Sequence, residues 1–461
     1  MSGVTELWQM SAGDLARLIR ARQASSREVV DAHLDRIDAV NGRVNAIVEV
    51  LAEPARAQAD AADRAVAAGD ARGALHGVPV TIKQNIDVAG TATTLGVQAL
   101  KDAIAPQDSP PVERLREAGA IVIGRTNLPD VALRWHTDSS LAGATINPWD
   151  ADASPGGSSG GEAVSLATGM SPLGVGTDLG GSVRIPAAAC GVVSLKVTWG
   201  RVADVSVVAP PPPPAIARMD TTGPMARRVA DLRTAFDLLR GPSDRDARYR
   251  AADLPERVEP TRFAVVVPDG THPDVARALE RAAGALEDAG WTRGDATTPD
   301  FGAALEMWLV LIGHDIAEVM PLLRAVCGEQ ALAFLDLMLG ALPNIDDATF
   351  DSLITGGRDA LIAEWAAFQA TTPLVVAPVM TQPTYSPGAD LVDPLAVTAS
   401  LACVPPLNLL GLPAAVVPVG RSGNRPIGAQ LIGPAWREDV CLAAAEVLEA
   451  AGAPVTPIDP R

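Results

Sequence analysis

The chain has 461 residues, of which 48% are hydrophobic and 20% charged, so it can bury a large core and is not a disordered protein. Aromatic residues make up only 3%, so alanine, valine and leucine must build most of that core. The formal net charge of −18 disfavours nucleic acid and anionic membranes as partners, because both are themselves negatively charged.

Cysteine usage and the N-terminus bear on the cellular compartment. The four cysteines, at positions 190, 327, 403 and 441, form no CxxC pair, so we expect neither a disulfide framework nor a zinc site. The first ten residues contain no basic stretch followed by an apolar one, so no signal peptide is expected. The most apolar window, 307–342, is interrupted by charged residues and is too polar for a membrane span. These features predict a soluble cytoplasmic protein.

Helices and short strands alternate along the first third of the chain. Ser11 with Asp14, and Ser25 with Glu28, have the spacing of capping boxes and predict two helix starts. The next elements are expected at 53–68 (helix), 78–82 (buried strand), 111–118 (helix) and 120–123 (strand). This alternation predicts an α/β fold in which helices cover both faces of a sheet.

The remaining elements follow two glycine-rich segments. A loop is expected at 147–161, a helix at 162–168 and a glycine-rich turn at 174–182. The prolines at 210–214 predict a stiff polyproline loop. Further elements are expected at 226–239 and 273–289 (helices), 263–267 and 374–377 (strands), and 414–419 with 427–432 (a hairpin turning at 422–424).

The two glycine-rich segments, 154–161 and 176–184, place small polar residues where the backbone is least restricted. Consecutive N–H groups in such turns can form an anion or oxyanion site. A phosphate-binding loop is disfavoured because neither segment matches GxxxxGK[ST]. A nucleophile elbow formally matches Gly156–Gly160, but no strand leads into Ser158, as that motif requires.

A third interpretation pairs these loops with Lys83, at the end of the predicted strand 78–82. Burial lowers the pKa of a lysine toward neutrality, and a neutral lysine can serve as the base for a serine hydroxyl. On this segment alone, a lysine that reaches past the strand end into solvent is the better interpretation.

The loops and the lysine together resemble the amidase signature family of serine hydrolases. The resemblance rests on the segments 156–161 and 174–187 and on three residues, Lys83, Ser158 and Ser182. These three residues are separated by 75 and 24 positions, as in that family's Lys-Ser-Ser set. Similar flanking text occurs at 77–79, 125–129, 147–150, 222–225, 411–414 and 430–434. The resemblance spans nearly the whole chain, 1–461, and is weakest over 240–370, a segment that is variable in this family and helps to shape its substrate pocket.

The sequence departs from the family's pattern outside the three catalytic positions. Gln84 stands where an Asp usually follows the lysine, Ala153 replaces a common Arg, and Ser194 and Val197 interrupt a usual Gly-Leu-Lys-Pro text. The first departure removes a negative charge near Lys83, which would let the pKa of the lysine fall further.

The resemblance implies a single large α/β/α domain with a central twisted mixed sheet. It implies that Ser182 is the nucleophile, that Ser158, after a cis peptide bond, relays the proton, and that Lys83 is the base. The oxyanion hole would consist of the N–H groups of Leu179, Gly180, Gly181 and Ser182. The supporting residues would be Ser159, Asp178 and Arg184. No metal or organic cofactor is implied, because the lysine supplies the base.

The implied reaction is hydrolysis of C–N bonds in small amides, with carbamates and some esters as further substrates, by a monomer or homodimer. The alternative is the glutaminase-type subunit of a tRNA-dependent amidotransferase, which works with partner subunits. Apolar runs at 307–312 and 332–339, with the proline loop as a wall, favour neutral, apolar or aryl amides and carbamates over glutamine, since no basic cluster accompanies them. Met307 and Trp308 are interpreted as core residues and not as site residues.

Overall fold

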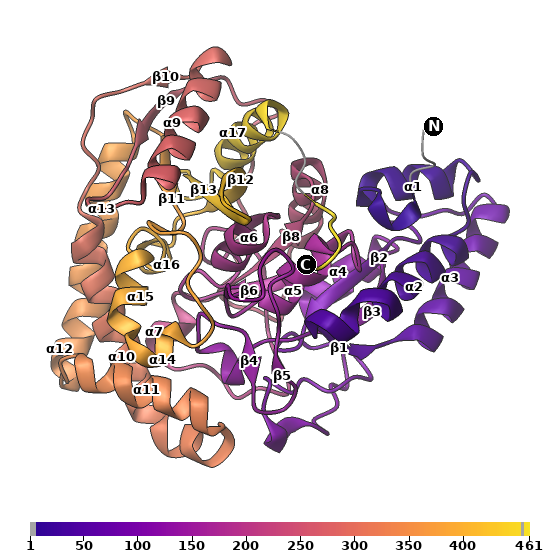
Figure 1. Ribbon diagram of the computed structural model, residues 1–461, viewed down its shortest axis with the longest axis horizontal. Helices are drawn as coiled ribbons and strands as arrows, with labels where there is room; N and C mark the ends of the chain where they lie inside the picture. The colour runs from indigo at the N-terminus through magenta and orange to yellow at the C-terminus, as the bar shows by residue number, and fades with distance from the viewer. Residues whose placement is uncertain (1–5, 453–455) are drawn as a thin grey trace.

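The computed structural model describes residues 6–452 and 456–461, and within them an eleven-stranded mixed sheet forms the centre of the molecule (Figure 1). The strands lie side by side in the order β1-β3-β2-β6-β8-β7-β12-β13-β11-β9-β10. Their bounds are β1 Ile47–Val50, β2 Pro79–Lys83, β3 Ile121–Thr126, β6 Leu173–Asp178, β7 Val193–Lys196, β8 Thr221–Ala226, β9 Arg262–Val265, β10 Thr292–Arg293, β11 Leu374–Pro378, β12 Ala414–Ser422 and β13 Arg425–Ile432. A small separate ribbon pairs β4 (Asp138–Ser139) with β5 (Gly143–Ala144).

Strand direction determines which chain ends meet at one edge of this sheet. Strand β2 lies between β3 and β6 and is parallel to both, whereas β8 is antiparallel to β6 and β7. The carboxyl ends of neighbouring parallel strands lie at the same edge of a sheet, which is where ligands bind in open α/β folds. Lys83 at the end of β2 and Asp178 at the end of β6 are therefore brought to one edge.

Helices cover both faces of the sheet, which confirms the predicted α/β class. Along β3, Val122 belongs to one apolar cluster and its neighbours Ile121 and Ile123 to the other, as the two-residue period of a strand requires. The first cluster includes residues of α1 (Ala12–Arg20), α4 (Pro110–Glu117), α8 (Val229–Leu239), α9 (Pro273–Asp288) and α17 (Glu438–Ala451). The second includes residues of α2 (Ser26–Val44), α5 (Gly160–Ala167), α6 (Arg184–Cys190), α10 (Phe301–Val326) and α11 (Glu329–Ala341).

The helices have the following bounds: α1 Ala12–Arg20, α2 Ser26–Val44, α3 Ala52–Ala67, α4 Pro110–Glu117, α5 Gly160–Ala167, α6 Arg184–Cys190, α7 Pro214–Ala217, α8 Val229–Leu239, α9 Pro273–Asp288, α10 Phe301–Val326, α11 Glu329–Ala341, α12 Asp347–Ser352, α13 Arg358–Gln369, α14 Ala389–Val392, α15 Pro394–Ser400, α16 Pro406–Leu409 and α17 Glu438–Ala451. Short 3₁₀ turns cover Leu7–Gln9, Gln98–Leu100 and Asp130–Ala132, and a π-helical turn covers Leu353–Gly357.

The segment 240–370 divides into two parts. Strands β9 and β10, with α9, extend the edge of the sheet, whereas α10 to α13 lie outside it and form the orange side of the molecule in Figure 1. The second part contains the two apolar runs that the sequence analysis associates with a pocket.

Local sequence patterns predict several of these elements correctly. Ser25 accepts a hydrogen bond from the N–H of Glu28, whose side chain in turn accepts one from the N–H of Ser25, so the predicted capping box is confirmed. The predicted hairpin is also present, with Ser422 paired to Arg425 across its turn. The four cysteines are free thiols.

One local prediction is wrong, and a second holds only in part. The expected turn at 174–182 begins as strand β6, because its glycines serve close packing and not chain reversal: a Cβ at Gly174 would lie 1.8 Å from Oε1 of the buried Glu162. Residues 210–213 form neither helix nor strand, as the predicted loop requires, but Pro214 is the first residue of α7. The N–H groups of Ala215 and Ile216 in α7 donate to Asp315 of α10.

Candidate active site

The Lys83 side chain meets a serine that is distant in the sequence. Lys83 is fully buried, and its Nζ is hydrogen-bonded to Oγ of Ser158 at 2.7 Å and to Oγ1 of Thr177 at 3.0 Å. Thr177 lies on β6, the strand next to β2. The alternative interpretation, in which Lys83 reaches into solvent, is therefore wrong, because the strand end is covered by the loop that carries Ser158.

Burial changes the protonation of this lysine. It lowers the pKa of Lys83 from 10.5 to about 7, against the opposing effect of the carboxylates of Asp220, Asp178 and Glu162. An amine that is neutral near pH 7 can accept a proton from an adjacent hydroxyl. The sequence analysis did not identify Asp220 and Glu162, because neither lies close to Lys83 along the chain.

Ser158 and Ser182 belong to two loops that contact each other. Ser158 follows a cis peptide bond from Gly157 and lies in the loop that precedes α5. Ser182 lies in the loop between β6 and α6, and its carbonyl accepts a hydrogen bond from the N–H of Ser159 at 3.1 Å. The structure thus brings the three predicted catalytic residues to one edge of the sheet.

Asp178 and Arg184 form a buried ion pair that organises the second loop. Arg184 donates to both carboxylate oxygens of Asp178, at 2.9 and 3.1 Å. The same carboxylate accepts the N–H groups of Gly181 at 2.9 Å and Val183 at 3.1 Å, and the side-chain amide of Asn408 at 3.0 Å. Burial alone would raise the pKa of Asp178, but the charge and hydrogen bonds of Arg184, with smaller effects of Lys196 and Asn408, together hold that pKa well below its usual range.

The ion pair also affects the predicted oxyanion hole. Gly181 already donates its N–H to Asp178. The N–H groups of Leu179, Gly180 and Ser182 have no acceptor among the described residues. Of the four predicted donors, three are therefore free to meet a ligand, and Gly181 holds the loop in place.

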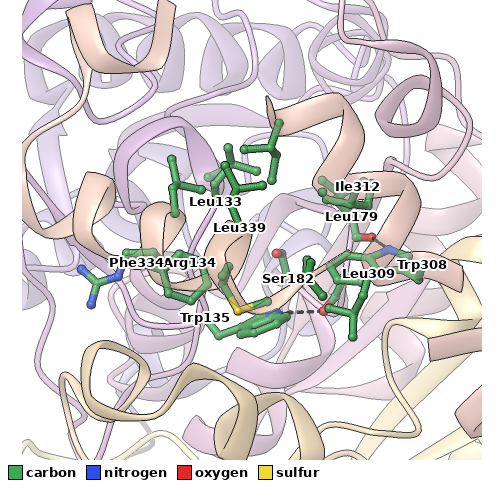
Figure 2. A pocket seen from close by; sticks show the side chains of 17 residues that line it. Leu133, Arg134, Trp135, Leu179, Ser182, Trp308, Leu309, Ile312, Phe334 and Leu339 are labelled. Carbon is green, nitrogen blue, oxygen red and sulfur yellow. Dashed lines mark hydrogen bonds between the residues drawn. The ribbon is translucent and has the colours of Figure 1, made fainter. Parts of the chain in front are cut away.

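An apolar cavity opens next to Ser182. Its empty volume, including the open mouth, is about 600 Å³. Figure 2 shows Ser182 among the side chains that line it. The lining residues are Ala132, Leu133, Arg134, Trp135, Leu179, Gly180, Ser182, Trp308, Leu309, Ile312, Gly313, Ile316, Phe334, Leu335, Met338, Leu339 and Leu342.

This lining agrees only partly with the sequence analysis. Both apolar runs, on α10 and α11, contribute to the cavity, but Trp308, interpreted as a core residue, faces it, whereas Met307 is not in the lining. The proline loop is not in the lining either, because α7 packs against Asp315. Trp135 was missed altogether, since no local pattern connects the loop before β4 with Ser182.

Arg134 is the cation in this lining, and it is already paired. It forms a two-pronged ion pair with Asp390 of α14, at 2.9 and 3.0 Å, and both side chains are buried. Its remaining nitrogen donates to Gln330 of α11. The cavity therefore offers an apolar surface and no unpaired positive charge.

Comparisons with known proteins identify the class of enzyme to which this fold belongs. The family model described as Amidase matches residues 28–442. Indoleacetamide hydrolase from Bradyrhizobium diazoefficiens is 39% identical over 96% of this chain and 86% of its own length. A glutamyl-tRNA(Gln) amidotransferase subunit from Deinococcus deserti is 33% identical over 96% of this chain and 97% of its own. The crystal structure of a bacterial aryl acylamidase of the amidase signature family superposes with a TM-score of 0.83, at 26% identity, over 97% of both chains.

The chain belongs to the amidase signature family and is a hydrolase of C–N bonds. Within residues 6–452 and 456–461, no group of histidine, cysteine and acidic side chains is arranged to hold a metal ion. In the same part of the chain, no helix is both long and apolar enough to cross a membrane.

Proposed function

We propose that the protein hydrolyses small amides with an uncharged apolar or aryl acyl group, through an acyl-enzyme on Ser182. The observation that carries this proposal is the 2.7 Å contact between Nζ of Lys83 and Oγ of Ser158 beside the cavity that contains Ser182. The lowered pKa of Lys83, about 7, supports its role as the base.

In the proposed reaction, neutral Lys83 takes the proton of Ser158, which in turn takes the proton of Ser182. The Oγ of Ser182 attacks the substrate carbonyl carbon, and the C–N bond breaks as the leaving nitrogen receives that proton by the reverse route. Water then attacks the acyl ester, which releases a carboxylic acid and restores the Ser182 hydroxyl.

The free N–H groups of Leu179, Gly180 and Ser182 stabilise the negative oxygen that forms during each attack. Removing one such donor in a serine hydrolase typically costs about 10²-fold or more in turnover. Asp178, Arg184 and Ser159 support the loop: Asp178 and Arg184 through their ion pair, and Ser159 through its N–H to the carbonyl of Ser182.

The substrate class follows from the cavity. Apolar side chains of α10 and α11 favour an apolar or aryl acyl group, and the pairing of Arg134 with Asp390 leaves no cation for a substrate carboxylate. Two relatives are named as an indoleacetamide hydrolase and an aryl acylamidase. These names agree with a substrate in which the acyl group or the amine is aromatic. Carbamates and esters of similar shape are further candidate substrates, since the same attack applies to them.

The alternative function is that of the glutaminase-type component of an amidotransferase, which the 33% identity to the Deinococcus deserti protein supports. A glutaminase acts on glutamine, whose charged amino and carboxylate groups need polar partners. The apolar cavity does not supply them, so we rank this function second.

A substrate panel tests the proposal. Purified protein is assayed with indoleacetamide, acetanilide, an aryl carbamate, a p-nitrophenyl ester and glutamine, beside the Ser182→Ala variant. We expect Ser182-dependent hydrolysis of the neutral aryl substrates and little glutamine turnover. Glutamine as the best substrate, or co-purification with a second protein that activates glutamine hydrolysis, would instead support the alternative.

A further inference from the structure

We propose that Trp135 and Trp308 are positioning residues that hold the oxyanion loop, in addition to lining the cavity. The inference rests on the proposed role of residues 179–182 in the reaction. Trp308 donates its indole N–H to the carbonyl of Leu179 at 3.1 Å, and Trp135 donates to the carbonyl of Gly180 at 3.1 Å (Figure 2).

These two bonds act on peptide planes that matter for the reaction. The carbonyl of Leu179 and the N–H of Gly180 belong to one planar trans peptide and point in opposite directions. A bond that fixes the carbonyl therefore fixes the direction of the N–H as well. Trp308 thus sets the orientation of the Gly180 N–H, which is one of the three free donors next to Ser182.

The next peptide plane is held at both ends. Its carbonyl, from Gly180, accepts the bond from Trp135, and its N–H, from Gly181, donates to Asp178. Loss of the Trp135 bond leaves the Asp178 bond in place, whereas loss of the Trp308 bond leaves the Leu179–Gly180 peptide without a hydrogen bond to the described residues. We therefore expect Trp308 to matter more than Trp135.

Both indoles are themselves firmly placed. Their ring centroids lie 6.3 Å apart, and Phe334 packs edge-on against Trp135 at 6.0 Å. Gly180 lies directly against the Trp308 ring, because a Cβ there would lie 2.6 Å from the ring's Cζ2 atom. The Trp135 backbone is fixed by Tyr385, whose hydroxyl donates to its carbonyl. The two rings therefore join the pocket helices to the catalytic loop.

The test removes the indole N–H and keeps an aromatic ring. Trp308→Phe and Trp135→Phe are compared with wild type on acetanilide, which has a small acyl group, and on phenylacetanilide, which has a large aromatic one. Trp365→Phe is the matched control, because Trp365 is buried outside the cavity lining and its indole N–H has no hydrogen-bond partner among the described residues. Thermal unfolding verifies that each variant is folded.

If the tryptophans position the loop, Trp308→Phe lowers kcat for both substrates by about ten-fold, and Trp135→Phe lowers it less. The KM for acetanilide changes little, because a displaced N–H donor weakens stabilisation of the transition state and not binding of the substrate. The pH profile stays as in wild type, since Lys83 is untouched. Trp365→Phe keeps kcat for both substrates within two-fold of wild type. If Trp308→Phe keeps kcat for acetanilide within two-fold of wild type, the inference is wrong and the tryptophans are pocket walls only.

A second measurement covers the case of a variant that folds poorly or a wild type that hydrolyses neither amide. Site-specific replacement of Trp308 by benzothienylalanine exchanges the N–H for sulfur and preserves the ring. The rate at which a fluorophosphonate labels Ser182 then reports on the loop without amide turnover. We expect about ten-fold slower labelling, and an unchanged rate would overturn the inference. A wild type that is labelled but inert toward every amide overturns the proposed function alone.

Discussion

The loops at the ends of β2 and β6 and the helices α10 and α11 meet at Ser182, but they are built in different ways. In the loops, buried polar groups are paired with one another: Lys83 with Ser158 and Thr177, and Asp178 with Arg184. In the helices, apolar side chains form one wall of an open cavity. The first region depends on hydrogen-bond geometry and the second on side-chain shape.

This difference predicts which property of the enzyme a substitution in each region should change. A change in the loops leaves a buried polar group unpaired and moves the reacting groups, so it should affect the chemical step. A change in the helices alters apolar contact with the acyl group, so it should affect substrate choice. Substitutions in each region can test this division.

Replacing the proposed nucleophile should have the largest effect. Ser182→Ala is expected to lower kcat by about 10³-fold or more and to abolish labelling by a sulfonyl fluoride, while the protein stays folded. Ser165→Ala is the matched control, because Ser165 is also buried and its hydroxyl has no partner among the described residues. Labelling mapped by mass spectrometry to Ser158 would contradict the assignment and favour a nucleophile elbow.

The proposed role of Lys83 as the base predicts how kcat/KM depends on pH. Because the pKa of Lys83 is lowered to about 7, kcat/KM of the wild type should rise with pH through about 7 and then level off. Lys83→Met should lower kcat by about 10²-fold or more and remove that rise. An unchanged pH profile in the variant would assign the base to another group.

Stability gives an independent check on the same lysine. Between about pH 7 and pH 10, the unfolded chain holds a proton on Lys83 that the folded protein lacks. Relative to Lys83→Met, the wild type should therefore gain stability as the pH rises, by up to about 1.4 kcal/mol per pH unit. Urea unfolding of both proteins across this range measures the difference, and a constant difference would show that the folded-state pKa is not lowered.

The buried ion pair should combine a stability effect with an activity effect. Asp178→Asn leaves the charge of Arg184 without its partner and weakens the bonds to Gly181 and Val183. We expect a loss of about 3–5 kcal/mol in the free energy of unfolding and a kcat lower by about 10²-fold. Glu280→Gln, which breaks the surface pair with Arg293, is the control and should cost about 1 kcal/mol or less.

The pocket should give the smallest and most selective effect. Each methylene added to a short series of acyl anilides should raise kcat/KM about four-fold, because burying it contributes about 0.8 kcal/mol. Ile312→Ala, in the cavity lining, should reduce this increment for the longer members and leave acetanilide unchanged. Leu322→Ala, on the exposed side of the same helix, should do neither. A flat response along the series in the wild type would show that the cavity does not hold the acyl group.

Much of the architecture and the proposed catalytic set could be predicted from local patterns. The capping box at Ser25 and the turn before Arg425 depend on residues that are neighbours in the chain, so their chemistry is readable in the sequence. The resemblance to the amidase signature family indicated Lys83, Ser158 and Ser182 through glycine-rich segments of fixed spacing. The family is confirmed, and the roles of these three residues remain a prediction that the experiments above address.

Tertiary structure decided what depends on contacts between distant segments. The residues from Gly174 form a strand and not a turn because Glu162 packs against them, and the free donors near Ser182 are three and not four because Asp178 accepts the N–H of Gly181. Trp308 of α10 and Trp135 of the loop before β4 reach the same loop only in the folded chain. The two indole hydrogen bonds join residues more than forty positions apart, so no local pattern encodes them, and the order of strands and helices alone brings their partners together.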